Sequence, residues 1–172
     1  MKPEIVPIPW KDVEAWLREL AQRMGGVDCI LGIARSGAPL ATALSYLTPN
    51  ATLGYVTRTV PVGPEAASYD FEGSRKDRAA DLARTLRLPT LPEGLRSFLI
   101  VDDVATFGDT MDRVRRLVAS RYPEASIRMA CFAADVERVR DAHPDLVALI
   151  EHSRGIDNQA TYLTFPWNLE SI

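Results

Sequence analysis

The chain has 172 residues, of which 47% are hydrophobic and 25% are charged, and its formal net charge is -3. This length and composition are those of one folded domain, and they argue against intrinsic disorder and against two separate domains. The slight acidity gives no electrostatic reason to expect a nucleic-acid or membrane-surface partner. Local backbone and a few placed cations must therefore hold any phosphate group.

Cysteine usage and the N-terminal segment indicate the cellular environment. Cys29 and Cys131 each lie in an apolar run, so we expect two buried free thiols rather than a disulfide or a metal site. The first ten residues contain three prolines and lack the apolar core of a signal peptide. No stretch approaches the ~20 apolar residues of a transmembrane helix. These features predict a cytoplasmic protein.

Hydrophobic periodicity predicts helices that alternate with strands. Apolar residues recur at helical spacing from Trp10 to Met24, and the apolar run Cys29–Ala34 is typical of a strand buried on both faces. A helix rich in small residues should follow at residues 38–47. Further strands are expected over residues 52–60, 98–101, 127–133 and 146–150, with helices over residues 108–122 and 136–142. The sequence thus predicts an α/β fold with a mostly parallel central sheet flanked by helices.

One long segment interrupts this alternation. Residues 61–96 are largely polar and contain Pro61, Pro64, Pro89 and Pro92, two near each end. An insertion of this length inside a compact domain is more often a functional loop than a linker, so we expect it to take part in function.

The segment from Phe98 to Thr110 has the clearest chemical pattern. Its strand ends in Asp102 and Asp103, and ligands of parallel sheets bind at the carboxyl ends of the strands. Adjacent carboxylates repel each other unless donors or cations engage them, and two vicinal ribose hydroxyls and a Mg²⁺ ion are suitable partners. A helix then begins at Gly108, where free amides and the helix dipole favour a phosphate. A diol site beside a phosphate site describes a ribose 5-phosphate.

This segment resembles the phosphoribosyl pyrophosphate loop of the type I phosphoribosyltransferases. Four apolar residues, two acids, two small or apolar residues, Thr106, Gly108 and Thr110 occur in the family's order. The alternative is a solvated acidic turn that caps a helix, which explains the acids and the glycine but not the whole order. The resemblance implies catalytic roles for Asp102, Asp103 and Thr106, a magnesium site at Asp103, and substrate contacts from Ala105, Phe107, Gly108, Asp109 and Thr110.

A second resemblance lies upstream, at residues 32–39. It is similar to the family's pyrophosphate loop, in which a strand ends in a small residue, a cation and a glycine. The resemblance implies that Arg35 acts in catalysis, that Ser36 and Gly37 bind substrate, and that a non-proline cis peptide bond precedes Arg35. The alternative is an ordinary strand-to-helix turn with a surface arginine.

Two weaker resemblances concern the long segment and the C-terminal tail. Residues 68–70 and 74–76 resemble the family's mobile catalytic loop, in which Lys76 or Arg75 would reach the pyrophosphate; the alternative is a solvated charged surface. Residues 162–167 resemble the hood of the small bacterial and archaeal purine phosphoribosyltransferases, the xanthine-guanine and hypoxanthine kind. There Tyr162 would stack on the nucleobase, and the alternative is that it only packs the tail onto the domain.

The family resemblance also implies a layout for the whole chain. We expect one phosphoribosyltransferase-like domain over residues 1–172, with a core over about residues 27–152 and a small hood from about residues 1–26 and 153–172. A mobile loop is expected over about residues 61–96. The resemblance further implies a homodimer.

The sequence departs from the 6-oxopurine members of the family at the positions that recognise the purine. Thr106 stands where those members have an aspartate that acts as a base, and Phe107 replaces a usual threonine. Ala134 stands where a lysine would contact the exocyclic oxygen of the purine, and Asn168 replaces the acid expected after the Pro-Trp pair. The sequence therefore supports binding of the phosphoribosyl group better than it supports any particular base.

The expected activity is magnesium-dependent transfer of ribose 5-phosphate from phosphoribosyl pyrophosphate to a nucleobase, with a purine-like acceptor favoured. Thr106, Phe107 and Ala134 leave open an alternative of another class, a regulatory protein that binds phosphoribosyl pyrophosphate or a nucleotide without catalysis. An orotate-like pyrimidine acceptor is also open, because threonine at position 106 is closer to that branch of the family.

Overall fold

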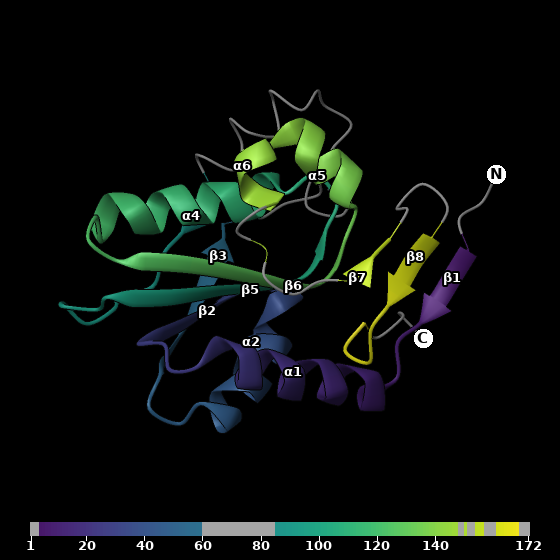
Figure 1. Cartoon of the computed structure of the whole chain (residues 1–172), viewed down its shortest axis with the longest axis horizontal. Coiled ribbons are helices and arrows are strands. Elements are labelled where there is room, and N and C mark those ends of the chain that lie inside the picture. Colours follow the sequence, from purple (N-terminus) through teal and green to yellow (C-terminus); the bar gives the residue numbers. More distant parts are fainter. Residues whose placement is uncertain (1–3, 60–84, 148–149, 151–153, 157–160, 169–172) are drawn as a thin grey trace.

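The computed structural model describes residues 4–59, 85–147, 150, 154–156 and 161–168. A six-stranded sheet with the strand order β4-β3-β2-β5-β6-β7 forms its centre (Figure 1). In that order the strands are Leu86–Arg87, Thr52–Arg58, Cys29–Ile33, Ser97–Ala105, Ser126–Ala134 and Arg154–Gly155. Neighbouring strands are parallel except β3 and β4, which pair antiparallel. The predicted α/β class with a mostly parallel sheet is confirmed.

Helices cover both faces of this sheet. α1 (Trp10–Met24) and α2 (Gly37–Leu47) lie on one face, and α4 (Asp109–Arg121) lies on the other (Figure 1). α5 (Val136–Ala142) and α6 (Pro144–Val147) follow β6 and lie beside the first turn of α4. Because successive side chains of a strand point to opposite faces, β5 contributes Phe98 and Ile100 to the core under α4 and Leu99 to the core under α1 and α2.

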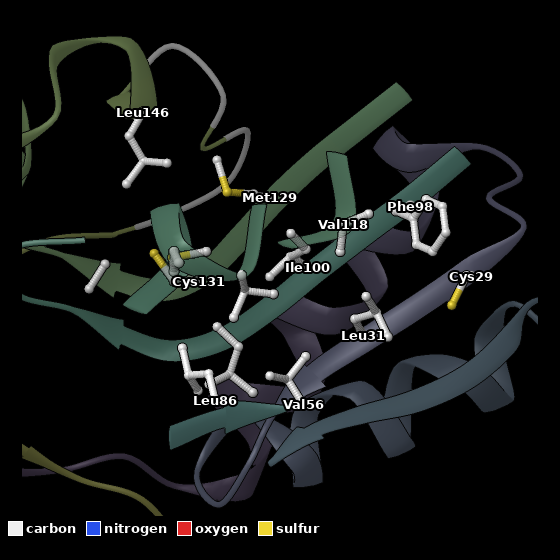
Figure 2. Close-up of a cluster of buried hydrophobic side chains, with 14 of the residues drawn as sticks. Cys29, Leu31, Val56, Leu86, Phe98, Ile100, Val118, Met129, Cys131 and Leu146 are labelled. Carbon is white, nitrogen blue, oxygen red and sulfur yellow. The ribbon is translucent and has the colours of Figure 1, made fainter. Parts of the chain in front are cut away.

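The core between the sheet and α4 contains both cysteines (Figure 2). Cys29 and Cys131 are buried free thiols, as predicted. Burial, together with the charge of Asp28, raises the pKa of the Cys29 thiol to about 12, and burial likewise raises the pKa of Cys131. Both thiols therefore stay protonated at neutral pH and serve as small apolar side chains.

A second, two-stranded sheet joins the two ends of the chain. β1 (Glu4–Pro7) pairs in parallel with β8 (Thr161–Thr164), with Ile5 opposite Tyr162. This pair lies beyond the β7 end of the main sheet (Figure 1). α1, which the sequence analysis assigned to the hood, instead buries its apolar stripe of Val13, Trp16, Leu17, Leu20 and Met24 against the main sheet.

A row of aromatic rings fastens the C-terminal segment to the core. The ring of Phe165 meets Phe132 edge to face at 5.3 Å and stacks on Trp167 at 4.9 Å. Phe132 also contacts Trp16 of α1 at 5.7 Å, and Trp167 contacts Trp10 at 5.6 Å. Burial of rings of this size dominates local packing energy, so these contacts hold β8 at a defined place.

Two expectations about secondary structure differ from the structure. Of the strand expected over residues 146–150, Leu146 and Val147 instead belong to α6, and Ile150 forms a bridge to Met129 of β6. Short apolar runs fit a helix and a strand equally well, and the proline at the start of α6 favours a first helical turn. The loop expected over residues 61–96 ends earlier than predicted, because Leu86 lies in β4 and Leu91 is buried in the core.

None of the helices in the described part of the chain has the length and apolar character needed to cross a membrane.

Candidate functional site

The candidate site lies where the parallel strands end. β2, β3, β5 and β6 run in the same direction, so their carboxyl ends share one edge of the sheet. That edge carries the turn at Arg35, the last residue of β3 (Arg58), and the acidic pair Asp102 and Asp103 near the end of β5. The two loops that the sequence singled out are therefore neighbours in space.

The turn after β2 is held very close to β5. Its peptide bond between Ala34 and Arg35 is cis, as the resemblance implied. α2 begins at Gly37, and a Cβ atom built there would lie 2.5 Å from the main-chain oxygen of Val101 and 2.9 Å from the Cα atom of Asp102. Only glycine permits this approach, so the backbone of the turn packs directly against the start of the acidic pair. The Arg35 side chain is exposed at the mouth of the turn.

The acidic pair carries charge in a poorly solvated place. Desolvation and the neighbouring Asp103 charge raise the pKa of Asp102 well above its ordinary value. Desolvation also raises the pKa of Asp103, while the backbone amide of Val104 and the Ser36 hydroxyl donate hydrogen bonds that lower it. The Val104 amide lies 2.7 Å from Asp103 Oδ1. A diol or a cation placed here would relieve the repulsion between the two carboxylates.

The loop after β5 has the geometry of an anion site. Gly108 caps α4 with a left-handed φ of 76°, and the first intrahelical bond runs from the Asp112 amide to the Gly108 oxygen. The earlier amides of a helix have no intrahelical partner and carry the positive end of the dipole. A cavity of about 150 Å³ opens beside this turn, lined by Arg58 and Asp102 and by residues 104–111. The predicted substrate-binding or catalytic residues Ala105, Thr106, Phe107, Asp109 and Thr110 all line it.

A second cavity joins this one to the turn after β2. It measures about 210 Å³ and is lined by Ile33, Ala34, Arg35, Ser36, Arg58, Leu86, Asp102, Asp103 and Thr110. Arg58, Asp102 and Thr110 line both cavities, so the two cavities are neighbours and together form the candidate site. One end of it is the helix terminus at Gly108, whose cavity we call the phosphate-type site. The other end carries Arg35, and the acidic pair lies between them.

Lys76 and Tyr162 are the two remaining predicted site residues. Lys76, with residues 68–75 of the proposed catalytic loop, lies outside the described residues. Tyr162 lies on β8 with 57% of its surface exposed, and it does not line either of these two cavities. Its role as a stacking ring remains a prediction.

Three site residues were missed by the sequence analysis. Arg58 adds a cation between the two cavities, and its position at the end of a β-rich run was the available signal. Arg138 places its guanidinium 5.2 Å from the centre of the Phe107 ring. His143 hydrogen-bonds to Asp109 across 34 positions of sequence. No sequence pattern marks either contact, because both depend on how α5 packs against the loop.

Comparison with known proteins agrees with this geometry. A model of the phosphoribosyl transferase domain matches residues 6–153. The chain belongs to the phosphoribosyltransferase family. No curated protein sequence matches it significantly.

Solved phosphoribosyltransferases share its fold. A xanthine-guanine-hypoxanthine phosphoribosyltransferase from Helicobacter pylori is 12% identical with a TM-score of 0.63, over 98% of this chain and 95% of that one. A purine phosphoribosyltransferase from Pyrococcus horikoshii is 18% identical with a TM-score of 0.60, over 98% and 97%. An orotate phosphoribosyltransferase from Aeropyrum pernix is 18% identical with a TM-score of 0.50, over 91% and 68%.

Three positions at which this phosphoribosyltransferase differs from the 6-oxopurine members have defined surroundings in the structure. Ala134 is 1% exposed, so its methyl group offers nothing to a ligand. Phe107 lies against the Arg138 guanidinium, and Asn168 accepts a hydrogen bond from the Phe165 amide through its side-chain oxygen. Phe107 and Asn168 therefore each make a local structural contact.

A third and larger cavity, of about 630 Å³, adjoins the ends of β6 and β7. It is lined by Asp135, Val136, Glu137, Arg138, Asp141, Gly155 and Ile156. The Asp135 side chain caps α5 by accepting a hydrogen bond from the Arg138 amide, and its other oxygen lies 3.3 Å from Arg138 Nε. Since Arg138 also covers Phe107, it separates this cavity from the phosphate-type site.

Proposed function

We propose that this phosphoribosyltransferase moves ribose 5-phosphate from phosphoribosyl pyrophosphate to a nitrogen atom of a nucleobase, releasing pyrophosphate. The observation that carries the proposal is the pair of neighbouring cavities that share Arg58, Asp102 and Thr110 as lining residues. It offers a helix terminus for the 5-phosphate, an acidic pair for the ribose hydroxyls, and a cationic turn for the pyrophosphate, in the order in which the substrate carries these groups.

Each part of the site has a defined task in this reaction. The amides from Gly108 to Thr110, with the Thr110 hydroxyl, hold the 5-phosphate. Asp102 and Asp103 accept hydrogen bonds from the two ribose hydroxyls and so fix the sugar for attack. Arg35 and the amides of its turn stabilise the charge that grows on the departing pyrophosphate. Positioning and charge stabilisation supply most of the rate, as in other transfers without a protein nucleophile.

The residues present suit a Mg²⁺ ion held jointly by protein and substrate. In the described part of the chain no cluster of three or more potential metal-binding side chains occurs, which rules out a cage built there from protein alone. Mg²⁺ usually takes one or two carboxylates and completes its shell with water and substrate phosphates, and Asp103 with Asp102 offers that donor set. A bound Mg²⁺ would supply charge neutralisation at the pyrophosphate and lower the repulsion within the acidic pair.

A purine-like base is the favoured acceptor. The cavity of about 630 Å³ is large enough for a planar base, and Arg138, which lines it, lies between this cavity and the Phe107 ring of the phosphate-type site. The resemblance of residues 162–167 to the hood of the purine enzymes supports this choice. Tyr162 would stack on that base, and Lys76 would close over the pyrophosphate. A homodimer is proposed from the family resemblance alone.

A second function is favoured by one specific observation. Thr106 stands where the 6-oxopurine members have an aspartate, and a hydroxyl is a poor proton acceptor at neutral pH. Ala134 stands where those members have a lysine, and its side chain is buried. A protein that binds phosphoribosyl pyrophosphate or a nucleotide without turnover would need the phosphate and ribose groups but neither of these.

Release of pyrophosphate separates the two functions. The purified protein is incubated with phosphoribosyl pyrophosphate and a panel of purine and pyrimidine bases, with and without Mg²⁺. We expect release that depends on one base and on Mg²⁺ and that Asp103→Asn and Arg35→Ala both abolish, while Arg18→Ala on the exposed side of α1 leaves it unchanged. Saturable binding without release for any base would favour the regulatory protein, and neither binding nor release would contradict both functions.

A further inference from the structure

The helix after β6 is packed directly onto the turn that would hold the 5-phosphate. A Cβ atom built on Gly108 would lie 2.5 Å from Leu146 Cδ2 and 3.3 Å from Val139 Cγ1, with His143 Cδ2 at 3.7 Å. α5, α6 and the residue between them thus form a lid over the back of this turn. Any shift of α5 must therefore move the amides at the start of α4.

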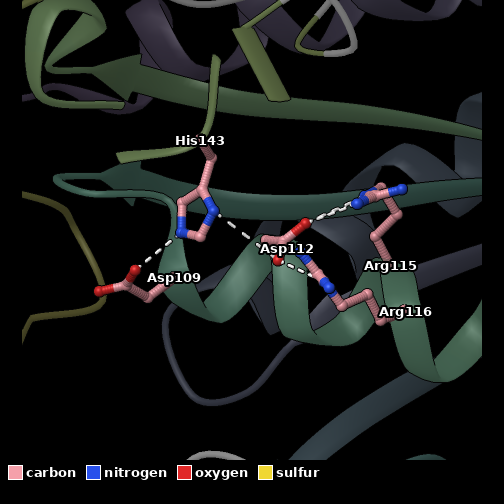
Figure 3. A network of polar contacts seen from close by, with 5 residues as sticks. All are labelled: Asp109, Asp112, Arg115, Arg116 and His143. Atoms are coloured by element: carbon pink, nitrogen blue, oxygen red, sulfur yellow. Dashed lines mark hydrogen bonds and ion pairs between the residues drawn. The ribbon is translucent and has the colours of Figure 1, made fainter. Parts of the chain in front are cut away.

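Within this lid, His143 makes a specific polar contact with the turn (Figure 3). Its Nε2 atom lies 2.7 Å from Oδ1 of Asp109, the first residue of α4, and its Nδ1 atom lies 3.7 Å from Oδ2 of Asp112, one turn later. The side chains of Asp109 and Asp112 are only 7% and 9% exposed. The imidazole therefore bridges two nearly buried carboxylates on the first turn of the helix, where a hydrogen bond to a charged group is stronger than at the surface.

The backbone holds the imidazole in place. The His143 amide donates to the Val139 oxygen at 2.7 Å and so ends α5, and the Leu146 amide donates to the His143 oxygen at 2.9 Å within the following turn. On the other side, burial alone would raise the pKa of Asp112, but the guanidinium groups of Arg115 and Arg116 hold it below its ordinary value. Asp112 is thus a fixed carboxylate, and the ring between it and Asp109 has little freedom to rotate.

Asp109 is the link between His143 and the ligand. It lines the cavity of about 150 Å³ together with Gly108 and Thr110, whose amides would bind the phosphate. An unrestrained carboxylate at this place could turn toward the anion and repel it. The hydrogen bond from His143 engages Oδ1 of Asp109 and fixes the residue that carries one of the binding amides.

We propose that His143 is a positioning residue for 5-phosphate binding, acting through Asp109. This inference rests on the proposed function, because it assigns the 5-phosphate to the turn at Gly108. It predicts that loss of the His143 side chain lowers the affinity for ligands that carry the 5-phosphate. The affinity for pyrophosphate, which binds at Arg35, should not change.

The test measures the two halves of the substrate separately by calorimetry, with ribose 5-phosphate and with pyrophosphate plus Mg²⁺. We expect His143→Ala to weaken ribose 5-phosphate about tenfold, the loss expected for one hydrogen bond to a charged group, and to leave pyrophosphate affinity within about twofold. His143→Gln, which keeps a donor near the Nε2 position, should recover most of the affinity. The exposed Arg140→Ala on α5 is the matched control and should bind both ligands like the wild type.

Each other outcome has a definite meaning. Unchanged ribose 5-phosphate affinity in His143→Ala would overturn the inference, because the predicted effect would be absent. An equal loss of affinity for both ligands would also overturn it, because that result indicates a general loss of folding. In an Asp109→Ala background, His143→Ala should cause no further loss, and additive losses would show that His143 does not act through Asp109. A wild-type protein that binds neither ligand would instead refute the proposed function on which the inference rests.

Discussion

Gly37 and Val101 touch through their backbones: a Cβ atom at residue 37 would lie 2.5 Å from the Val101 oxygen. This contact brings the start of α2 against the end of β5 and places Arg35 and Asp102 in one cavity. The site therefore depends on a glycine that has no functional group of its own.

Replacing Gly37 with alanine should damage both folding and binding. The added methyl group would meet backbone atoms of Val101 and Asp102, which cannot turn away as a side chain can, so we expect a loss of about 1–3 kcal/mol in the free energy of unfolding. Gly26→Ala is the control, because a Cβ atom there meets nothing within 4 Å. Urea denaturation of both variants would contradict the account if the two were equally stable.

Gly108→Ala should lower the free energy of unfolding more than replacement of a left-handed glycine in open space does. Gly108 and Gly94 have nearly the same φ, 76° and 79°, but a Cβ atom at residue 94 meets open space whereas one at residue 108 meets Leu146. Gly94→Ala should therefore lower the free energy of unfolding by only the backbone penalty of about 1–2 kcal/mol. Gly108→Ala should lose more in thermal or urea unfolding, and should also lose ribose 5-phosphate binding. Equal losses would show that α6 does not pack on this turn.

Asp102→Asn should stabilise the ligand-free protein at neutral pH. The folded state raises the pKa of Asp102 and Asp103 above the ordinary value of 3.8, so it holds these protons more tightly than the unfolded chain does. The stabilisation that they contribute is complete below the ordinary value and is lost as the pH rises through the raised values. We expect the free energy of unfolding, measured with urea across this pH range, to vary less with pH in the variant than in the wild type. At neutral pH it should be higher in the variant. Parallel curves would contradict the raised pKa.

Arg58 should matter for both halves of the substrate, and Arg35 for only one. Arg58 lines both cavities, whereas Arg35 lines only the one at the turn after β2. We expect Arg58→Ala to weaken ribose 5-phosphate and pyrophosphate several-fold each, and Arg35→Ala to weaken pyrophosphate alone. Calorimetry with each ligand measures this, and an Arg58→Ala protein with unchanged affinity for both ligands would remove Arg58 from the site.

The parts of this site that lie close together in the sequence were predictable from it. The strand, acidic pair and helix start of residues 98–110 form one local unit whose hydrophobic pattern and glycine are readable in order. Arg35 was found for the same reason. Arg58 was missed because its place in the site depends on β3 lying next to β2. The hydrophobic pattern of one strand does not reveal which strand is its neighbour.

Long-range contacts and short apolar runs were the other limits. The contact between His143 and Asp109 forms only because α5 folds back over α4, and neither residue carries a motif. Residues 146–150 fit a strand as well as a helix, because a run of so few apolar residues has no distinguishing period. In the structure Leu146 instead packs on Gly108 as part of α6.

Direct titration with phosphoribosyl pyrophosphate in the presence of Mg²⁺ is the most direct test of the central claim. The account predicts saturable binding at one site per chain, with a dissociation constant between about 1 µM and 1 mM, as is usual for enzyme substrates. It also predicts that Asp103→Asn and Gly108→Ala each remove most of this affinity. Absence of binding by the folded wild-type protein at millimolar ligand, or binding that neither substitution changes, would contradict the account.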